Sequence, residues 1–309
     1  MPDETPRDRD AAGDGARDGG EGARDERVTV VVLTYERAHE VCRTLSELAE
    51  LPERPEVIVV DNGSRGPTVA RLSELFPQVH VLPLSHNVGA AARNVGLLHA
   101  RTRYVAFCDD DTWWQPGALA HGADLLDAHP EVAVLTGRVL IGPEQREDPA
   151  CAEMAASPLV APCALPGPRT LGYLAGASMV RRDAFLAVGG YERRFFLGGE
   201  EALVAIDLAA AGWQLAYVPE LVVHHHPSSL RDARARRRLL RRNALWVAWL
   251  RRPVRHALRA TAALVAGAVR DPSLARGLAE AVVGLPWALR HRRRIPGNLE
   301  QELRLIDGR

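Results

Sequence analysis

Four short apolar runs, each ending in a polar turn, dominate the first third of the chain. The runs are Val28–Leu33, Glu56–Val60, Val79–Leu84 and Tyr104–Cys108. Residues at helical spacing follow the first three runs, over about His39–Glu50, Thr68–Phe76 and Val88–Ala100. Continuous apolar strands that alternate with helices predict an α/β fold, with a mostly parallel central sheet covered by helices on both faces.

The pattern is less regular beyond Trp114. It predicts helices over Pro116–Ala128, Asp183–Val188 and Glu200–Ala211, and strands over Val132–Leu140, Leu174–Arg181 and Leu215–Val223. Pro219 interrupts the last of these runs, so it predicts one or two short strands. Residues 142–170 are rich in Pro and Ala with little periodicity, and we expect a flexible insertion there, near a site.

Composition narrows the possible classes of protein. The 309 residues have a formal net charge of +0, so no global attraction to nucleic acid is expected. Residues 1–27 are mostly Gly, Ala and charged residues, which predicts a disordered tail without the apolar segment of a signal peptide. No run of 18 apolar residues marks a membrane span, and the four cysteines lack metal-ligand spacing, so we expect a cytoplasmic protein.

Three consecutive carboxylates, Asp109, Asp110 and Asp111, follow the fourth apolar run. Ligands of parallel sheets bind at the carboxyl ends of the strands. Three neighbouring acids repel one another unless positive charge lies among them, and a divalent cation that carries a phosphate ligand would supply it. A solvated acidic turn, or a helix cap made by Asp111, explains the same residues without a ligand.

Other polar segments also admit both a functional and a structural interpretation. Asp61 could contact a ribose or a base, or it could close an Asx-turn. The small residues of Asn87–Asn94 suit an anion at a helix N-terminus, or close packing on the sheet. Glu200 and Glu201 complement a helix dipole. The run His224–His226 suggests a metal ligand, although alternation along a strand lets at most one or two of the three share a site.

Taken together, these segments resemble the family 2 glycosyltransferases, which have the GT-A fold. The resemblance rests on TVVVLTYER, EVIVVDNGS, HNVGAAARN, YVAFCDDD, GASMVRRDAFLAVGGYERRFFLGGEE, GWQLAYVPELVVHHHPSS and RRNALW, in the family's order over about residues 28–250. Bacterial members such as rhamnosyl- and galactofuranosyltransferases are the most similar in pattern. The resemblance implies a three-layer α/β/α GT-A sandwich, followed by a C-terminal helical appendage.

The resemblance also implies roles for individual residues. The metal ligands, for Mn²⁺ or Mg²⁺, are Asp109, Asp111 and His225, with His224 or His226 as alternatives to His225. Residues that match the nucleotide-sugar site are Thr34, Tyr35, Glu36, Asp61, Asn87, Gly89, Arg93, Asn94, Asp109 and Asp110, the last being the variable middle residue of the Asp-x-Asp motif. The catalytic base is implied to be Glu201, with Glu200 as its alternative, because these two match a Glu-Asp pair whose second member is the base.

The C-terminal region has a different character. Arg clusters alternate with Leu and Trp over Arg231–Arg255, and apolar-basic helical patterns continue over Ala257–Arg270 and Ser273–Arg294. A basic amphipathic helix can lie on an anionic membrane, or it can pack its apolar face on the catalytic domain. We therefore expect a tail at residues 1–27, a catalytic domain at 28–228 and a basic helical region at 229–309.

These observations predict an inverting, metal-dependent glycosyltransferase. It would move a sugar from a UDP- or dTDP-sugar to a hydroxyl acceptor, either a cell-envelope glycan, a lipid-linked molecule or a secondary metabolite. The expected location is the cytoplasm, with peripheral contact at the inner face of the membrane and no nucleic-acid partner. The alternatives are a nucleotidyltransferase on the same sheet, and a non-catalytic basic module that binds membrane or nucleic acid. A dinucleotide-binding dehydrogenase is disfavoured because no Gly-x-Gly-x-x-Gly follows the first strand.

Overall fold

The computed structural model describes residues 25–227, 233–269 and 271–308. They form a nine-stranded sheet in the order β3-β2-β1-β4-β8-β6-β9-β5, with β7 paired to β6. The strands are β1 (Val28–Thr34), β2 (Glu56–Asp61), β3 (His80–Pro83), β4 (Tyr104–Asp109), β5 (Thr112–Trp114), β6 (Val132–Ile141), β7 (Arg146–Glu147), β8 (Ser178–Arg181) and β9 (Gln214–His225). Strands β1 to β4, β6 and β9 run in one direction and the other three run against them, which confirms the mostly parallel α/β fold.

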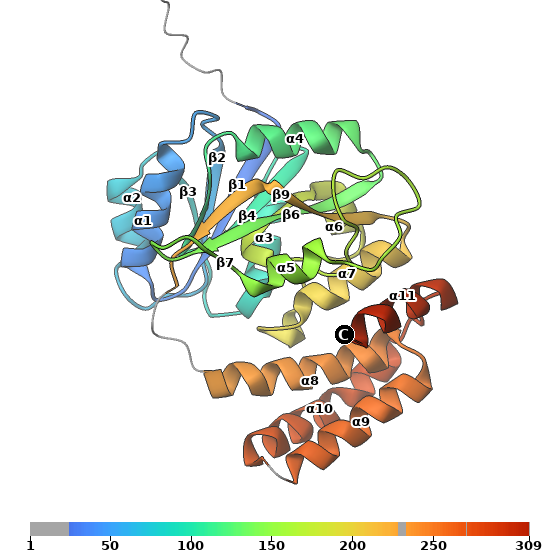
Figure 1. Cartoon of the computed structure of the whole chain (residues 1–309). Coiled ribbons are helices and arrows are strands. Elements are labelled where there is room, and N and C mark those ends of the chain that lie inside the picture. The colour runs from blue at the N-terminus through green and yellow to red at the C-terminus, as the bar shows by residue number, and fades with distance from the viewer. Residues whose placement is uncertain (1–24, 228–232, 270, 309) are drawn as a thin grey trace, which may run out of the picture.

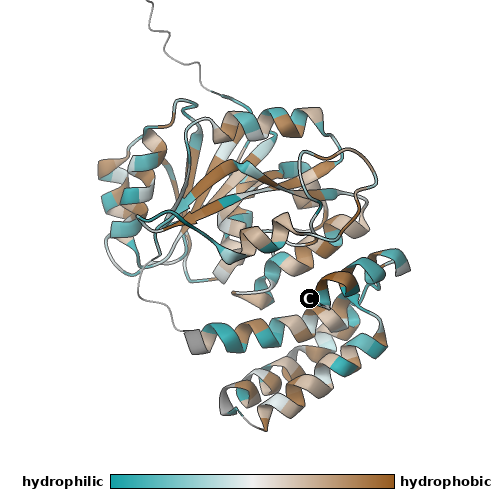
Figure 2. Ribbon diagram, viewed as in Figure 1, coloured by the Kyte–Doolittle hydropathy of each residue, from teal (hydrophilic) through white to brown (hydrophobic). Residues whose placement is uncertain are grey.

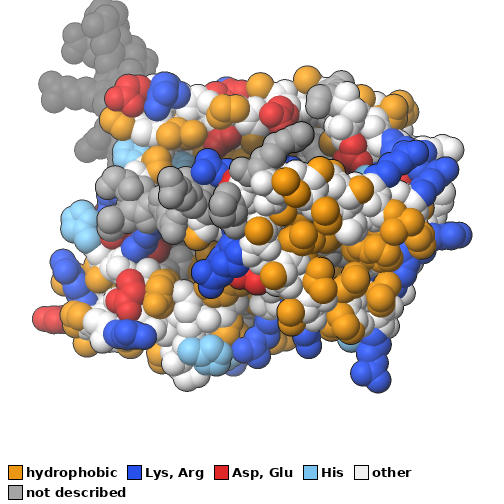
Figure 3. Space-filling model, turned by 90° about the horizontal axis from the view of Figure 1, so that it is seen from below, with side chains coloured by type: hydrophobic (Ala, Val, Ile, Leu, Met, Phe, Trp, Pro, Cys, Tyr) orange, Lys and Arg blue, Asp and Glu red, His pale blue; other side chains and the backbone are white. Residues whose placement is uncertain are grey.

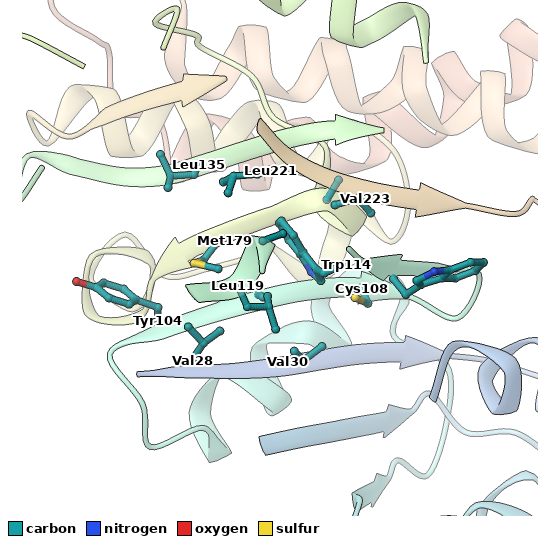
Figure 4. Packing of buried hydrophobic residues seen from close by; sticks show 14 of the residues in the cluster. Val28, Val30, Tyr104, Cys108, Trp114, Leu119, Leu135, Met179, Leu221 and Val223 are labelled. Atoms are coloured by element: carbon teal, nitrogen blue, oxygen red, sulfur yellow. The ribbon is translucent and has the colours of Figure 1, made fainter. Parts of the chain in front are cut away.

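Helices cover both faces of this sheet (Figure 1). They are α1 (Ala38–Ala49), α2 (Thr68–Leu75), α3 (Arg93–His99), α4 (Ala118–Ala128), α5 (Pro149–Ala155), α6 (Arg182–Ala187) and α7 (Glu200–Ala210), with 3₁₀ turns η1 (Gly89–Ala92), η2 (Ala175–Ala177) and η3 (Arg193–Phe195). Along β1, Val30 faces a core shared with α1, α2, α4 and α5, whereas Val31 faces one shared with α3, α6 and α7. Figure 4 shows the first core, where Trp114 and Leu119 pack over β4.

Four elements differ from the expectations. The segment 142–170 contains β7 and α5, the latter capped by Asp148, whose carboxylate accepts a hydrogen bond from the Ala150 N–H at 2.9 Å. Strand β9 is continuous, because a register shift against β6 between Gly137 and Arg138 accommodates Pro219. Strand β5 directly follows the three acids and has only three residues. It forms a strand because it pairs with β9, and its sequence is too short to show a strand pattern.

Four helices follow the sheet: α8 (Ala233–Arg251), α9 (Val254–Ala268), α10 (Pro272–Arg290) and α11 (Gly297–Asp307). The first three agree closely with the predicted basic helices, and α11 was not expected. A third core joins α7 to α8, α10 and α11 through residues such as Leu203, Trp246 and Leu303. Figure 2 shows hydrophilic residues at the start of α8 and more hydrophobic ones further along it. Within the described residues, no helix combines the length and the apolar character that crossing a bilayer requires.

The predicted tail lies almost wholly outside the described residues, which begin at Asp25. Its last residue, Arg27, makes ion pairs with Asp25, Asp124 and Asp127 at 2.7 to 2.9 Å. The chain is therefore fastened to α4 directly before β1 begins.

Candidate active site

The carboxyl ends of β1, β2 and β4 lie side by side. Thr34 at the end of β1 pairs in register with Asp61 of β2, and Leu33 pairs with Asp109 of β4. Parallel pairing therefore brings the polar residues that follow three separate strands to one edge of the sheet, as the sequence predicts.

The three acids after β4 have different surroundings. Asp109 is partly exposed and pairs with the guanidinium of Arg93. Asp110 is buried and accepts hydrogen bonds from Arg37 at 2.9 Å and from the Thr34 hydroxyl at 3.2 Å. Burial raises the pKa of Asp110 to about 7, in spite of the opposing charge of Arg37. Asp111 has no exposed surface, and its carboxylate lies 3.2 Å from Arg37.

The pairing of β5 with β9 distinguishes the three histidines. Thr112 lies opposite His225, whose Nε2 is 3.5 Å from an Asp111 carboxylate oxygen. The rings of His224 and His226 instead pack on Trp113, with centroids 5.8 and 4.8 Å away. Because alternate residues of a strand face opposite sides, His225 is the one directed toward the acids.

This donor set suits a hard divalent cation. Within the described residues, no three His, Cys, Asp or Glu side chains are arranged to hold a metal by themselves. Mg²⁺ and Mn²⁺ accept one or two carboxylates, with water and substrate phosphates completing the shell. Asp111 and His225 already lie together, and Asp109, two residues before Asp111, is partly exposed, so the residues fit an ion that arrives with a diphosphate.

Glu200 and Glu201 open α7 directly after Gly199, which caps the helix at a φ of +85°. Both are largely enclosed. Burial, followed by the charge of Glu201, raises the pKa of Glu200 to about 8, and burial also raises the pKa of Glu201. Burial alone would lower the pKa of Arg93, but the charges of Asp109, Tyr191 and the two glutamates raise it. Arg93 therefore pairs with Asp109 and lies close enough to the glutamate pair to be affected by its charge.

The raised pKa values predict a pH dependence. A general base acts in its deprotonated form, and a raised pKa means that the glutamate pair takes up a proton before the pH falls to the usual carboxylate range. We expect kcat/KM to rise with pH through neutrality and to level off above about pH 8. Initial rates between pH 5 and 9 test this, and a rate that is flat from pH 5 to 8 would contradict it.

A cavity of about 360 Å³ lies beside the ends of β1, β2 and β3. It is lined by Tyr35, Gly63, Ser64, Arg65, Leu84, Ser85, His86 and Asn87. Asp61 supports this cavity, because its carboxylate accepts hydrogen bonds from the N–H and hydroxyl of Ser64. Glu36 fastens the same loop by accepting a hydrogen bond from the Arg65 N–H at 2.8 Å. The carboxylate of Asp61 thus closes its own turn in this structure, through a bond that spans three residues rather than the two of an Asx-turn.

The segment Asn87–Asn94 connects the cavity to the acids. Asn87 accepts hydrogen bonds from the Asn62 side chain at 2.9 Å and from the Gly89 N–H at 2.8 Å. Asn94 donates to the Tyr191 carbonyl and accepts from the Tyr191 N–H, so its amide holds the loop that leads to α7. These contacts give both asparagines a positioning role.

Gly89 is predicted to be sensitive to substitution. Its φ is +67°, and an added Cβ would lie 1.9 Å from the carbonyl oxygen of Phe196. We expect Gly89→Ala to lower the free energy of unfolding by about 2–5 kcal/mol, from backbone strain plus overpacking. Gly117→Ala is the control, since Gly117 has a φ of +84° and open space around it, and should lose only about 1 kcal/mol. Equal losses in denaturant titrations would contradict the close contact.

Several residues of this site were not singled out from the sequence. Arg37 belongs to the first strand-end motif, but its contact with two of the acids depends on folding. Asn62 and His86 are sequence neighbours of the predicted site residues Asp61 and Asn87. Their position just after a predicted strand was the sequence signal that could have identified them. Tyr173 and Tyr191 had no such signal, because their nearness to the glutamate pair arises from packing between distant segments.

This fold and site define a nucleotide-sugar-binding class of transferase. The chain belongs to the family described as glycosyl transferase family 2, whose model matches residues 29–189, so the protein is a glycosyltransferase. The resemblance seen in the sequence is thereby confirmed.

Two curated relatives come from Mycobacterium tuberculosis. An N-acetylglucosaminyl-diphospho-decaprenol L-rhamnosyltransferase is 28% identical over 231 residues, which cover 64% of this chain and 75% of that protein. A pre-mycofactocin glycosyltransferase is 35% identical over 226 residues, which cover 68% of this chain but 45% of that protein.

Solved structures share the fold. A mannosyltransferase from Pyrobaculum calidifontis, in complex with GDP-Man and Mn²⁺, matches 93% of this chain and 77% of its own with a TM-score of 0.56 and 21% identity. GalNAc-T7 with UDP, GalNAc and Mn²⁺ matches 72% of this chain and 47% of its own, with a TM-score of 0.56 and 14% identity. At these identities the likeness concerns the GT-A architecture.

Proposed function

We propose that this family 2 glycosyltransferase transfers a sugar from a UDP- or dTDP-sugar to a hydroxyl group with inversion, using Mn²⁺ or Mg²⁺. The observation that carries the proposal is the position of Arg93. It pairs with Asp109 and is influenced by both Glu200 and Glu201, so the acids after β4 and the glutamates of α7 face one reaction centre.

The chain offers separate places for the parts of a donor. The cavity lined by Tyr35, Arg65 and His86 suits a nucleoside, and its position beside β2 and β3 leaves the acids free for the diphosphate. Asp109, Asp111 and His225 would hold the divalent ion. When bound, that ion stabilises the negative charge that develops on the leaving diphosphate.

Glu201 is assigned as the base. The acceptor oxygen attacks the anomeric carbon on the side opposite the diphosphate, and a new C–O bond forms as the bond to the nucleoside diphosphate breaks. The bonding electrons leave with the diphosphate, and the acceptor proton passes to the carboxylate. Burial has raised the pKa of Glu201, which makes it a stronger base than an exposed glutamate.

A screen of sugar nucleotides tests this function. The purified chain should be stabilised by UDP or dTDP in the presence of Mn²⁺, and it should slowly hydrolyse the matching sugar nucleotide. Removal of the divalent ion with EDTA should abolish both effects, and excess Mn²⁺ should restore them. Metal-independent binding, or no binding of any nucleoside diphosphate, would overturn the proposal.

The relatives suggest the kind of acceptor. One of them is named for N-acetylglucosaminyl-diphospho-decaprenol and the other for pre-mycofactocin. Either type brings a free hydroxyl to the enzyme, and the first would bring it at a membrane. A cytoplasmic enzyme with peripheral contact at the inner face of the membrane fits the lipid-linked alternative.

The side of α9 and α10 supports such contact. Their exposed apolar residues include Leu258, Val265, Val282 and Val283, the last 82% exposed. The two helices contain Arg255, Arg259, Arg276 and Arg290 but a single acid, Glu280. Figure 3 shows hydrophobic side chains gathered on this face among arginines. Exposed apolar residues bordered by cations suit the surface of an anionic bilayer.

Flotation with anionic liposomes tests the membrane contact. We expect the chain to float with the vesicles at low salt and to be released at high salt. Val283→Glu should weaken partitioning about tenfold, because burial of a valine contributes more than 1.4 kcal/mol. Val160→Glu is the control, since Val160 is 84% exposed but lies in the catalytic domain. No co-flotation at low salt would exclude this contact.

A further inference from the structure

A second and larger cavity, of about 860 Å³, lies between the catalytic domain and the C-terminal helices. Its walls come from α5 and the segment after it, from α7, from α8 and from α11. Its volume falls within the range of ligand-binding sites in proteins. The residues around it are separate from those that line the nucleoside cavity, so the two spaces can be occupied together.

The wall formed by α8 is apolar and elongated. Leu240, Ala244, Val247 and Ala248 line the cavity from one face of the helix, and Arg252 follows on the same face. At a rise of 1.5 Å per residue, the twelve steps from Leu240 to Arg252 extend over about 18 Å. An apolar wall of this length fits an extended hydrocarbon chain better than it fits a sugar or a nucleotide.

One end of the cavity reaches the catalytic helix. Gly199 and Ala202 line it, and between them in the chain stand Glu200 and Glu201. Tyr173 also lines it, and burial followed by Tyr191 and the two glutamates raises the pKa of that tyrosine, so its hydroxyl lies near the glutamate pair.

The segment that ends at Gly176 connects the cavity with the diphosphate side. Tyr173 and Leu174 line the cavity, whereas a Cβ on Gly176 would lie 2.8 Å from a carboxylate oxygen of Asp109. Four residues therefore span the distance from the cavity wall to the acids after β4. A molecule in the cavity would have one end beside the reaction centre.

The other end of the cavity carries charges that are already neutralised. Arg252 makes ion pairs with Glu300 and with Asp307, the latter at 2.8 Å. His256 lies beside them, and burial lowers its pKa, which favours the neutral ring. Because these groups satisfy one another, this end places no requirement for charge on a ligand.

We propose that this cavity holds the hydrocarbon chain of a lipid-linked acceptor, whose hydroxyl then lies at Glu201. The inference rests on the proposed glycosyl transfer and names the class of acceptor. The donor does not compete for the space, because its nucleoside has its own cavity and its diphosphate lies at the acids. The hydrocarbon chain of the acceptor would run along α8, from Gly199 toward Arg252.

Binding of n-alkyl β-glucosides to the purified full chain tests the proposal without any transfer reaction. Calorimetry with hexyl to decyl glucosides, each below its critical micelle concentration, should give affinities that rise about three- to fourfold with each added methylene. Ala244→Phe and Ala248→Leu place atoms inside the cavity and should weaken decyl glucoside binding at least tenfold. Ala70→Phe, at an exposed position on α2, is the matched control and should bind as the unaltered chain does.

The outcomes separate this proposal from the proposed function. Binding of UDP or dTDP with Mn²⁺, measured on each variant, establishes that its catalytic domain is intact. Affinity that does not depend on chain length, or an equal loss in Ala70→Phe, overturns the cavity assignment while donor binding stands. If the protein binds a compact alcohol such as 2-naphthol more tightly than decyl glucoside, the cavity takes a ring-shaped acceptor rather than a hydrocarbon chain. If the protein binds alkyl chains but binds no nucleoside diphosphate, both the proposed glycosyl transfer and the acceptor role of the cavity are overturned.

Discussion

Glu201→Gln is expected to lower kcat for sugar transfer by about 10²–10⁴-fold, the usual contribution of a general base. Glutamine keeps the size and most of the polarity of the side chain but cannot accept the proton of the acceptor hydroxyl. Donor binding should persist, because the diphosphate is assigned to Asp109, Asp111 and His225 rather than to α7. The measurement is nucleoside diphosphate release with a soluble acceptor, together with a donor dissociation constant from calorimetry.

Glu200→Gln is the matched comparison. Glu200 is only 4% exposed, and the charge of Glu201 adds to burial in raising the pKa of Glu200 to about 8. Because the protons of two interacting carboxyl groups belong to the pair, Glu200→Gln should move the acidic limb of the pH–rate profile to lower pH, with a much smaller loss of kcat. If the large loss falls on Glu200→Gln instead, the base is Glu200. Near-wild-type turnover in both variants would refute the assignment of the base to this pair.

Asp111→Asn is expected to abolish the effect of Mn²⁺ on nucleoside diphosphate binding, and to lower kcat/KM by about 10²–10³-fold. Asp111 is fully buried, and its carboxylate lies between Arg37 and His225. Asparagine preserves the volume but removes the negative charge that a divalent ion needs. Calorimetric titration of UDP or dTDP with and without Mn²⁺ reads this effect directly and does not depend on turnover.

Asp110→Asn is the control for Asp111→Asn. The carboxylate of Asp110 accepts hydrogen bonds from Arg37 and Thr34, and its backbone carbonyl accepts one from Thr44 at 2.8 Å. Its oxygens therefore support the turn, and the Mn²⁺ effect on nucleotide binding should survive its replacement. An equal loss of the Mn²⁺ effect in both variants would contradict the assignment of Asp111 over Asp110 as a metal ligand. Thermal unfolding of both proteins shows whether either loss comes from instability.

Local patterns predicted most of the fold, because they report on burial along a single element. The apolar runs that became β1, β2 and β4 are continuous because both faces of those strands are buried. Strand β5 was not predicted, since three residues are too few for a period to show, and helix α5 was not predicted because residues 142–170 are rich in Pro and Ala with little periodicity. Helix α11 had a signal in Leu299, Glu300 and Leu303, which became buried on one face of the helix.

By itself, the sequence determined where the candidate functional residues lie along the chain. Acids follow a buried strand, a glutamate pair opens a helix, and histidines end another strand, because each of these placements follows from the period of its own element. Only the tertiary structure decided that His225, and neither of its neighbours, faces Asp111, and that Arg37 and Arg93 lie against the acids. It also decided that α7, α8 and α11 enclose a cavity, which Gly199 and Ala202 line on either side of the glutamate pair in the chain. The physical reason is that periodicity encodes the direction of a side chain from its own element, whereas convergence depends on how elements distant in sequence pack.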